Sequence, residues 1–176
     1  SITPGERIVL GRKPTGTLVL DYLLPGKRLY LLATGTGLAP FLSIIRDPFT
    51  YEQFEQVILV HGVRRAAELA YHDYITKDLP NDEYLGDSVR ERLLYYPTVT
   101  REPFRNQGRI TAALTDGTLE ATLQLPRLDP SEDRVMICGS SAMLHDLSTM
   151  LEEREFVEGN TSTPGGYVIE KAFAEK

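Results

Sequence analysis

Cysteine and clustered histidine are scarce in this sequence, and each shortage excludes a kind of structure or site. Among 176 residues there is one cysteine, Cys138, and no tryptophan. A single thiol cannot form an internal disulfide framework or a multi-cysteine metal site, so a reducing, cytoplasmic compartment is expected. His61, His72 and His145 lack the spacing of metal ligands and are expected at the surface or at helix caps. We therefore predict no bound metal.

An excess of positive charge and a long apolar run are also missing. Nineteen basic residues face 25 acidic ones, and the resulting net charge of −6 argues against a nucleic-acid partner. No apolar run reaches about 18 residues, and the first residues contain no signal-peptide core, so no membrane span is expected. A chain with 41% hydrophobic residues can build one domain, or one domain plus a fragment, and we expect a monomer.

The pattern of apolar residues changes near residue 27. Residues 1–26 contain short β-like pieces, "RIVLG" and "TGTLVL", interrupted by proline and glycine. They are too few to form a core and are interpreted as the last strands of a neighbouring β-domain. In residues 27–176, near-continuous apolar runs alternate with amphipathic segments, which is typical of strands buried on both faces by helices. The strands are expected at 28–34, 56–62, 93–100, 134–140 and 166–173, and the helices at 39–46, 66–76, 110–114 and 142–154.

This alternation predicts an α/β domain with a five-stranded parallel, doubly wound sheet. In such a sheet, ligands bind at the carboxyl ends of the strands. The residues that follow each strand are therefore the candidates for a binding site.

The first strand leads directly into the glycine turn "TGTGLAP". Gly35 and Gly37, on either side of Thr36, would let the backbone approach a phosphate closely, and amides at a helix start attract anions. Pro40 replaces the third glycine of the dinucleotide-binding pattern, but a proline is tolerated in the first helical turn because its missing N–H would be unpaired there. An ordinary tight strand-to-helix turn remains the alternative.

Arginines follow the second and third strands, and an NAD-selective fold would instead carry an acidic residue at the end of the second strand. Arg64 and Arg65 end the segment "HGVRR", while Arg101 and Arg109 follow the third strand. Guanidinium groups can bind a 2′-phosphate bidentately, whereas an acid would repel it. These arginines therefore favour a pocket for a phosphorylated nucleotide, with solvated loop arginines as the alternative.

The fourth strand ends in "MICGSSAM". Ser140 and Ser141 can cap the helix that follows. Cys138 lies at the end of the strand, where a lone cysteine is more often a small packed side chain than a nucleophile.

Together, in this order, "KPTGTLVLD", "LATGTGLAPF", "HGVR", "TRE", "GRI", "CGSSAM" and "VIEKAF" resemble bacterial ferredoxin–NADP⁺ reductase across essentially the whole chain. The resemblance implies a flavoenzyme with an N-terminal FAD-binding β-barrel and a C-terminal NADP(H)-binding α/β domain. Such an enzyme exchanges hydride with NADP(H) and single electrons with ferredoxin or flavodoxin.

The resemblance also implies roles for individual residues. Cys138 would lie near the nicotinamide during hydride transfer, and Glu170 would arrange the nicotinamide and a proton path. The remaining residues would contact the cofactors: Thr34, Ala172 and Phe173 on the FAD side; Gly35, Thr36, Gly37 and Pro40 at the pyrophosphate; Val63, Arg64, Thr100, Arg101 and Arg109 at the 2′-phosphate and adenosine; Ser140, Ser141, Ala142 and Asp146 elsewhere on the nucleotide.

One departure from the family pattern concerns the flavin. The Arg-x-Tyr-Ser signature and the phosphate-binding segment of the barrel are expected upstream of Ser1. Residues 1–26 would then be a remnant of a truncated FAD-binding barrel, residues 27–176 would be the NADP(H) domain, and FAD would be bound mostly by the missing part. Two alternatives stay open: a reductase module of an oxygenase or flavohaemoglobin, and a non-catalytic nucleotide-binding subunit for electron transfer.

Overall fold

Five parallel strands form the centre of the domain in the computed structural model, which describes residues 5–7 and 16–171. Their order across the sheet is β3-β2-β1-β4-β5, as expected for a doubly wound fold. Each expected strand is present, with ends within two residues of the prediction wherever the structure describes them. The strands are β1 (Arg28–Thr34), β2 (Gln56–Val63), β3 (Leu93–Val99), β4 (Asp133–Gly139) and β5 (Tyr167–Lys171).

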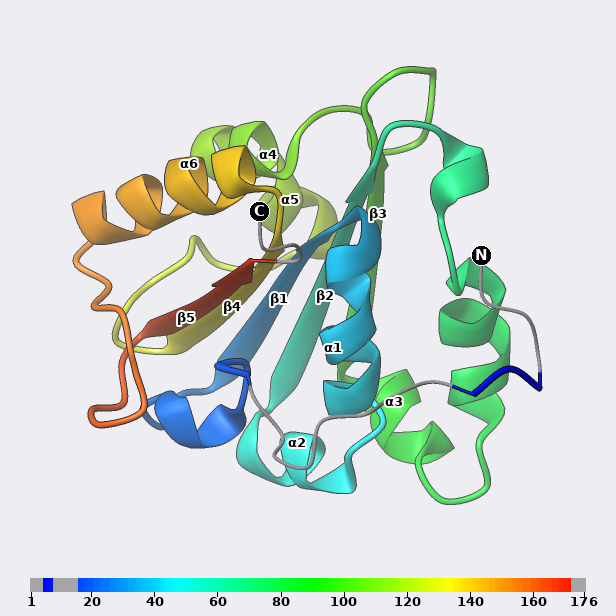
Figure 1. The fold of residues 1–176 in the computed structure, drawn as a ribbon, viewed down its shortest axis with the longest axis horizontal. Helices are drawn as coiled ribbons and strands as arrows, with labels where there is room; N and C mark the ends of the chain where they lie inside the picture. Colours follow the sequence, from blue (N-terminus) through cyan, green and yellow to red (C-terminus); the bar gives the residue numbers. More distant parts are fainter. Residues whose placement is uncertain (1–4, 8–15, 172–176) are drawn as a thin grey trace.

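Helices cover both faces of this sheet (Figure 1). Leu29 and Leu31 of β1 point to the face packed by α1, α2 and α3, while Tyr30 and Leu32 point to the face packed by α4, α5 and α6. Alternate residues of one strand are thus buried on opposite sides, which explains the near-continuous apolar runs. The helices are α1 (Leu38–Ile44), α2 (Pro48–Gln53), α3 (Gly86–Arg92), α4 (Ile110–Asp116), α5 (Thr118–Leu123) and α6 (Ser141–Glu153).

The prediction of one continuous helix at 66–76 is wrong. The chain instead forms a 3-10 turn, η3 (Ala66–Glu68), and then a π-helical segment, η4 (Tyr74–Asp78), followed by a second 3-10 turn, η5 (Leu79–Asn81). Between η3 and η4, Tyr71 adopts a left-handed conformation with φ of 58°. A residue with positive φ interrupts a right-handed helix, so the apolar spacing of this segment does not produce one.

Residues 16–26, the described part of the expected barrel remnant, pack beside the sheet without forming a strand. They contain the 3-10 turn η1 (Leu20–Tyr22) and make one isolated bridge, from Leu23 to Gly165. The described residues of "TGTLVL" therefore do not form a strand, although Val19 has extended backbone dihedrals. Within residues 5–7 and 16–171, no helix is both long enough and apolar enough to cross a bilayer.

His61 does not lie at the surface as expected. It is fully buried in β2, where its Nδ1 lies 3.3 Å from the Tyr95 hydroxyl. Burial, and next the nearby His72, lower the pKa of His61 from 6.5 to about 4, so the ring is neutral at physiological pH. His61 packs in the core and lies outside the cleft described below.

Candidate functional site

The strand order reverses direction at β1, which has β2 on one side and β4 on the other. At such a reversal the loops after the two central strands diverge to opposite faces and leave a crevice at their carboxyl ends. A cleft of about 840 Å³ lies at this end of the sheet, and its walls come from the loops after β1, β2, β3 and β4. The fold therefore gathers the residues that follow four strands into one site.

The glycine turn after β1 forms one wall of the cleft. Gly35 has a φ of +53°, and a Cβ added to it would meet no atom within 4 Å, so the backbone is exposed to a ligand on that side. Gly37 has a different role, because its added Cβ would lie 2.1 Å from the carbonyl oxygen of Cys138. Only glycine lets this turn pack against β4. Pro40 is the third residue of α1 and lies in the first turn, as predicted.

The start of α6 forms a second wall. The Ser140 hydroxyl accepts a hydrogen bond from the Met143 amide (3.4 Å), which confirms Ser140 as the cap of this 13-residue helix. The Ser140 amide in turn donates to the Thr34 hydroxyl (3.4 Å) and joins the ends of β4 and β1. Ala142 and Asp146 line the cleft from the first two turns of the helix. The positive end of the α6 dipole therefore points towards the cleft.

Arginines from two different loops reach the third wall. Arg64 follows β2 and Arg109 precedes α4, and both line the cleft together with Val63 and Thr100. The Thr100 amide donates to the Val63 carbonyl oxygen (3.1 Å), which holds the loop after β3 against the end of β2. Arg101 continues this pairing through its amide, which donates to the Arg64 carbonyl (2.9 Å). Its exposed side chain is not among the residues that line the cleft.

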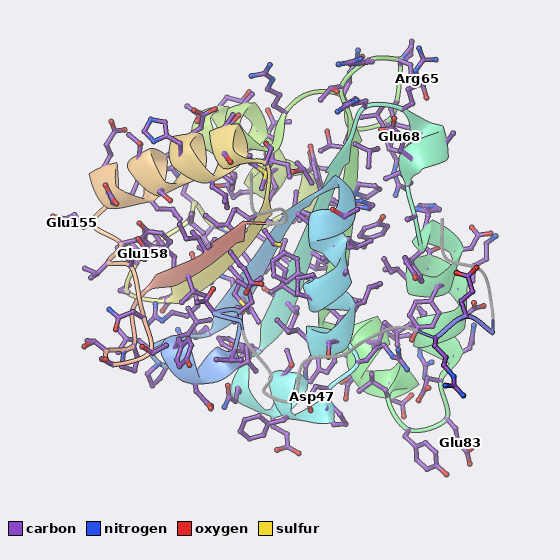
Figure 2. All side chains as sticks on the ribbon, viewed as in Figure 1. Asp47, Arg65, Glu68, Glu83, Glu155 and Glu158 are labelled. Atoms are coloured by element: carbon purple, nitrogen blue, oxygen red, sulfur yellow. The ribbon has the colours of Figure 1, made fainter. Side chains whose placement is uncertain are left out.

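Three residues of the loop after β2 line the cleft and were missed by reasoning from the sequence: Glu68, Ala70 and Tyr71. Glu68 lines the cleft, and its Oε2 accepts a hydrogen bond from the Arg64 amide (3.0 Å). Tyr71 lines it too, with 60% of its surface exposed. Figure 2 shows Glu68 beside Arg65 beyond the end of β2. All three lie in the segment that was predicted as a helix and that instead folds as an irregular loop.

Cys138 and Glu170 lie side by side, but they do not line the cleft. They are register partners on β4 and β5. Burial, and next the charge of Glu170, raise the pKa of the Cys138 thiol to about 11, so it stays protonated at neutral pH. The Thr17 amide donates to Glu170 Oε2 (2.8 Å). The pair therefore consists of a neutral thiol beside a hydrogen-bonded carboxylate.

The structure brings together ten of the predicted site residues around the cleft. The cleft is lined by Thr34, Gly35, Thr36, Val63, Arg64, Thr100, Arg109, Ser140, Ala142 and Asp146. The described residues outside the lining are Gly37, Pro40, Arg101, Cys138, Ser141 and Glu170. Ala172 and Phe173 lie outside the described residues.

The donors around the cleft suit an elongated anionic ligand. Arg64 and Arg109 supply two cationic groups, while Thr34, Thr36 and Ser140 supply hydroxyls near the open backbone of Gly35. Guanidinium groups bind phosphate bidentately, and hydroxyls can hydrogen-bond sugar and phosphate oxygens. The cleft is also large enough for a nucleotide.

Comparison with known proteins agrees with this description. A family model described as the NAD-binding domain of oxidoreductases matches residues 31–149. The ferredoxin–NADP reductase of Pseudomonas aeruginosa is 58% identical over 173 residues, which cover 98% of this chain and 67% of the relative. The flavodoxin/ferredoxin–NADP reductase of Rhodobacter capsulatus is 48% identical over 98% of this chain and 64% of its own length.

Among solved structures, a ferredoxin NADP⁺ reductase from Neisseria gonorrhoeae with bound FAD and NADP superposes with a TM-score of 0.79 at 30% sequence identity. The match covers 90% of this chain and 61% of that structure. The chain thus spans roughly two thirds of the length of the proteins it matches.

Proposed function

Because this chain belongs to the ferredoxin–NADP⁺ reductase family, we propose that it is the NADP(H)-binding part of a flavoprotein oxidoreductase. The enzyme would transfer hydride between NADP(H) and FAD and exchange single electrons with ferredoxin or flavodoxin. One observation carries the proposal: Arg64 and Arg109, from loops after different strands, line the same cleft as the glycine turn. That combination provides for a pyrophosphate and for a further phosphate on the adenosine.

In this proposal the cleft residues hold and orient the dinucleotide. The backbone around Gly35 and the start of α6 face the pyrophosphate, and Arg64 and Arg109 bind the 2′-phosphate. Arg101 lies at the rim, outside the lining, and contributes long-range charge. Binding that fixes the adenosine half in this way supports correct placement of the distant nicotinamide.

Cys138 and Glu170 would shape the end of the site where the nicotinamide reacts. A protonated thiol is small and uncharged, so Cys138 would limit the approach of the ring without attacking it. Glu170 would hold or transfer a proton at Oε2, the oxygen that accepts a hydrogen bond from the Thr17 amide.

FAD, when bound, supplies the group that accepts or donates the hydride. We propose that Thr34, at the end of β1, contacts FAD. The relatives extend beyond the matched part, and we propose that the rest of the flavin site corresponds to that remaining length. Residues 1–26 would join the two parts.

The direct test uses the full-length protein. We expect it to purify with bound FAD, to be yellow, and to reduce ferredoxin or flavodoxin with NADPH in preference to NADH. A preference for NADH would favour a reductase module of an oxygenase or flavohaemoglobin. A colourless protein without NADPH-dependent dye reduction would favour the non-catalytic nucleotide-binding subunit.

We further propose a cytoplasmic, monomeric protein. The single cysteine supports a reducing compartment, since no internal disulfide can form from it. Size-exclusion chromatography with light scattering of the full-length protein tests the oligomeric state.

A further inference from the structure

A carboxylate lies beside the arginine that the proposed function assigns to the 2′-phosphate. Glu68 is exposed, lines the cleft, and accepts a hydrogen bond from the amide of Arg64 (3.0 Å). It therefore occupies the backbone N–H of the residue whose side chain is assigned to the 2′-phosphate. In an NAD-selective fold the acidic residue follows the second strand directly, whereas here it comes four residues after Arg64.

A second carboxylate provides an internal comparison. Glu102 accepts a hydrogen bond from the amide of Ala66 (2.7 Å), so it also holds the loop that follows β2. Glu102 is not among the residues that line the cleft. Two glutamates thus support the same short segment through backbone amides, and of these two only Glu68 lines the cleft.

We propose that Glu68 is a specificity-determining residue that limits the preference of this cleft for the 2′-phosphorylated dinucleotide. This inference rests on the proposed function. A 2′-phosphate carries between one and two negative charges at neutral pH, and the Glu68 carboxylate repels it while competing for the Arg64 amide. A ligand with a free 2′-hydroxyl meets no such repulsion, and its hydroxyl can donate to the carboxylate.

The test compares two isosteric variants in the full-length protein, Glu68→Gln and Glu102→Gln. Each glutamine keeps an oxygen that can accept the backbone hydrogen bond but removes the charge. The probes are adenosine 2′,5′-bisphosphate and 5′-AMP, titrated by calorimetry at low and high salt. We expect Glu68→Gln to bind the bisphosphate about fivefold more tightly at low salt, with 5′-AMP unchanged. The gain should shrink at high salt because salt screens exposed charges.

Three results would count against the inference. An unchanged or weaker affinity of Glu68→Gln for the bisphosphate would overturn it. An equal gain of affinity in Glu102→Gln would also overturn it, because the effect would then come from the loop that both glutamates hold. An equal gain for 5′-AMP would also overturn it. Failure of the proposed function gives a different result: the unmodified protein would then bind the bisphosphate no better than 5′-AMP. Unfolding midpoints of both variants confirm that the fold is intact.

Discussion

At the scale of single residues, the two arginines after β3 are not equivalent. Arg109 lines the cleft, whereas Arg101 is exposed and lies outside the lining. A charge-assisted hydrogen bond contributes about 1.5–3 kcal/mol, so Arg109→Ala should weaken NADP⁺ binding by about 10- to 100-fold. Arg101→Ala should weaken it by no more than about threefold, as expected for an exposed charge that acts at a distance. Titration of both variants with NADP⁺ and NAD⁺ measures the difference.

NAD⁺ serves as the control ligand in that experiment, because it lacks the 2′-phosphate. Its affinity should be the same in both variants. If Arg101→Ala lost as much NADP⁺ affinity as Arg109→Ala, Arg101 would have to reach the phosphate in the bound state. An equal loss for NAD⁺ in Arg109→Ala would overturn the assignment of Arg109 to the 2′-phosphate.

His61 makes the stability of the protein depend on pH. The unfolded chain takes up a proton with a pKa near 6.5, whereas burial lowers the pKa of the folded state to about 4. The contribution is therefore fully present above pH 6.5 and is lost as the pH falls towards 4. Between pH 7 and pH 5, the free energy of unfolding should decrease by about 2 kcal/mol through this one group. Urea unfolding at the two pH values measures the change.

Two variants separate the effect of the buried His61 from that of the exposed His145. His61→Gln removes the buried titrating ring and should flatten the pH dependence by that amount. His145→Gln changes an exposed residue of α6 and should leave the dependence as it is. A pH dependence that survives in His61→Gln would mean that another group is responsible.

At the scale of elements, the turn between β1 and α1 contains two glycines with separate purposes. Gly37→Ala would force the turn away from β4, because its new methyl group would lie 2.1 Å from the Cys138 carbonyl oxygen. We expect a loss of about 3 kcal/mol in the free energy of unfolding. Gly35→Ala should cost only about 1 kcal/mol, through its positive φ, because its methyl group meets open space.

Affinity for NADP⁺ should not follow the order of stability of these two variants. The methyl group of Gly35→Ala projects from the cleft wall, so we expect about a tenfold loss of NADP⁺ affinity in a protein of nearly normal stability. Urea unfolding and NADP⁺ titration of the same samples provide the comparison. Normal NADP⁺ affinity in Gly35→Ala would show that the ligand does not approach this turn.

The elements also show what the sequence could and could not predict. The strands were predicted closely because long buried runs such as "QVILVHG" are unambiguous, and the rule that strand ends bind ligands then located Arg64, Arg109 and Ser140 at the cleft. The helices α2, α3 and α5, each six or seven residues long, were not predicted. Glu68 was missed because its place in the cleft depends on how an irregular loop folds back.

At the scale of the whole molecule, the cleft exists only when four strand ends are in place together. Its lining combines the glycine turn, both arginine loops and the start of α6, which lie up to about 100 residues apart in the chain. Unfolding separates these segments, so the unfolded chain cannot bind the dinucleotide as the folded protein does. Ligand binding should therefore be linked to global stability.

We expect NADP⁺ at 100 times its dissociation constant to raise the free energy of unfolding by about 2.7 kcal/mol, and a further tenfold increase to add about 1.4 kcal/mol. Thermal or urea unfolding of the full-length protein at several NADP⁺ concentrations measures this dependence. Arg109→Ala is the matched control, because an exposed arginine at the cleft should affect binding but not the unliganded fold. Its unfolding midpoint without ligand should equal that of the unmodified protein, and the same NADP⁺ concentrations should shift it far less. If the unfolding midpoint of the unmodified protein did not change with NADP⁺ concentration, this cleft would not bind the dinucleotide, because a ligand that binds only the folded state must stabilise it.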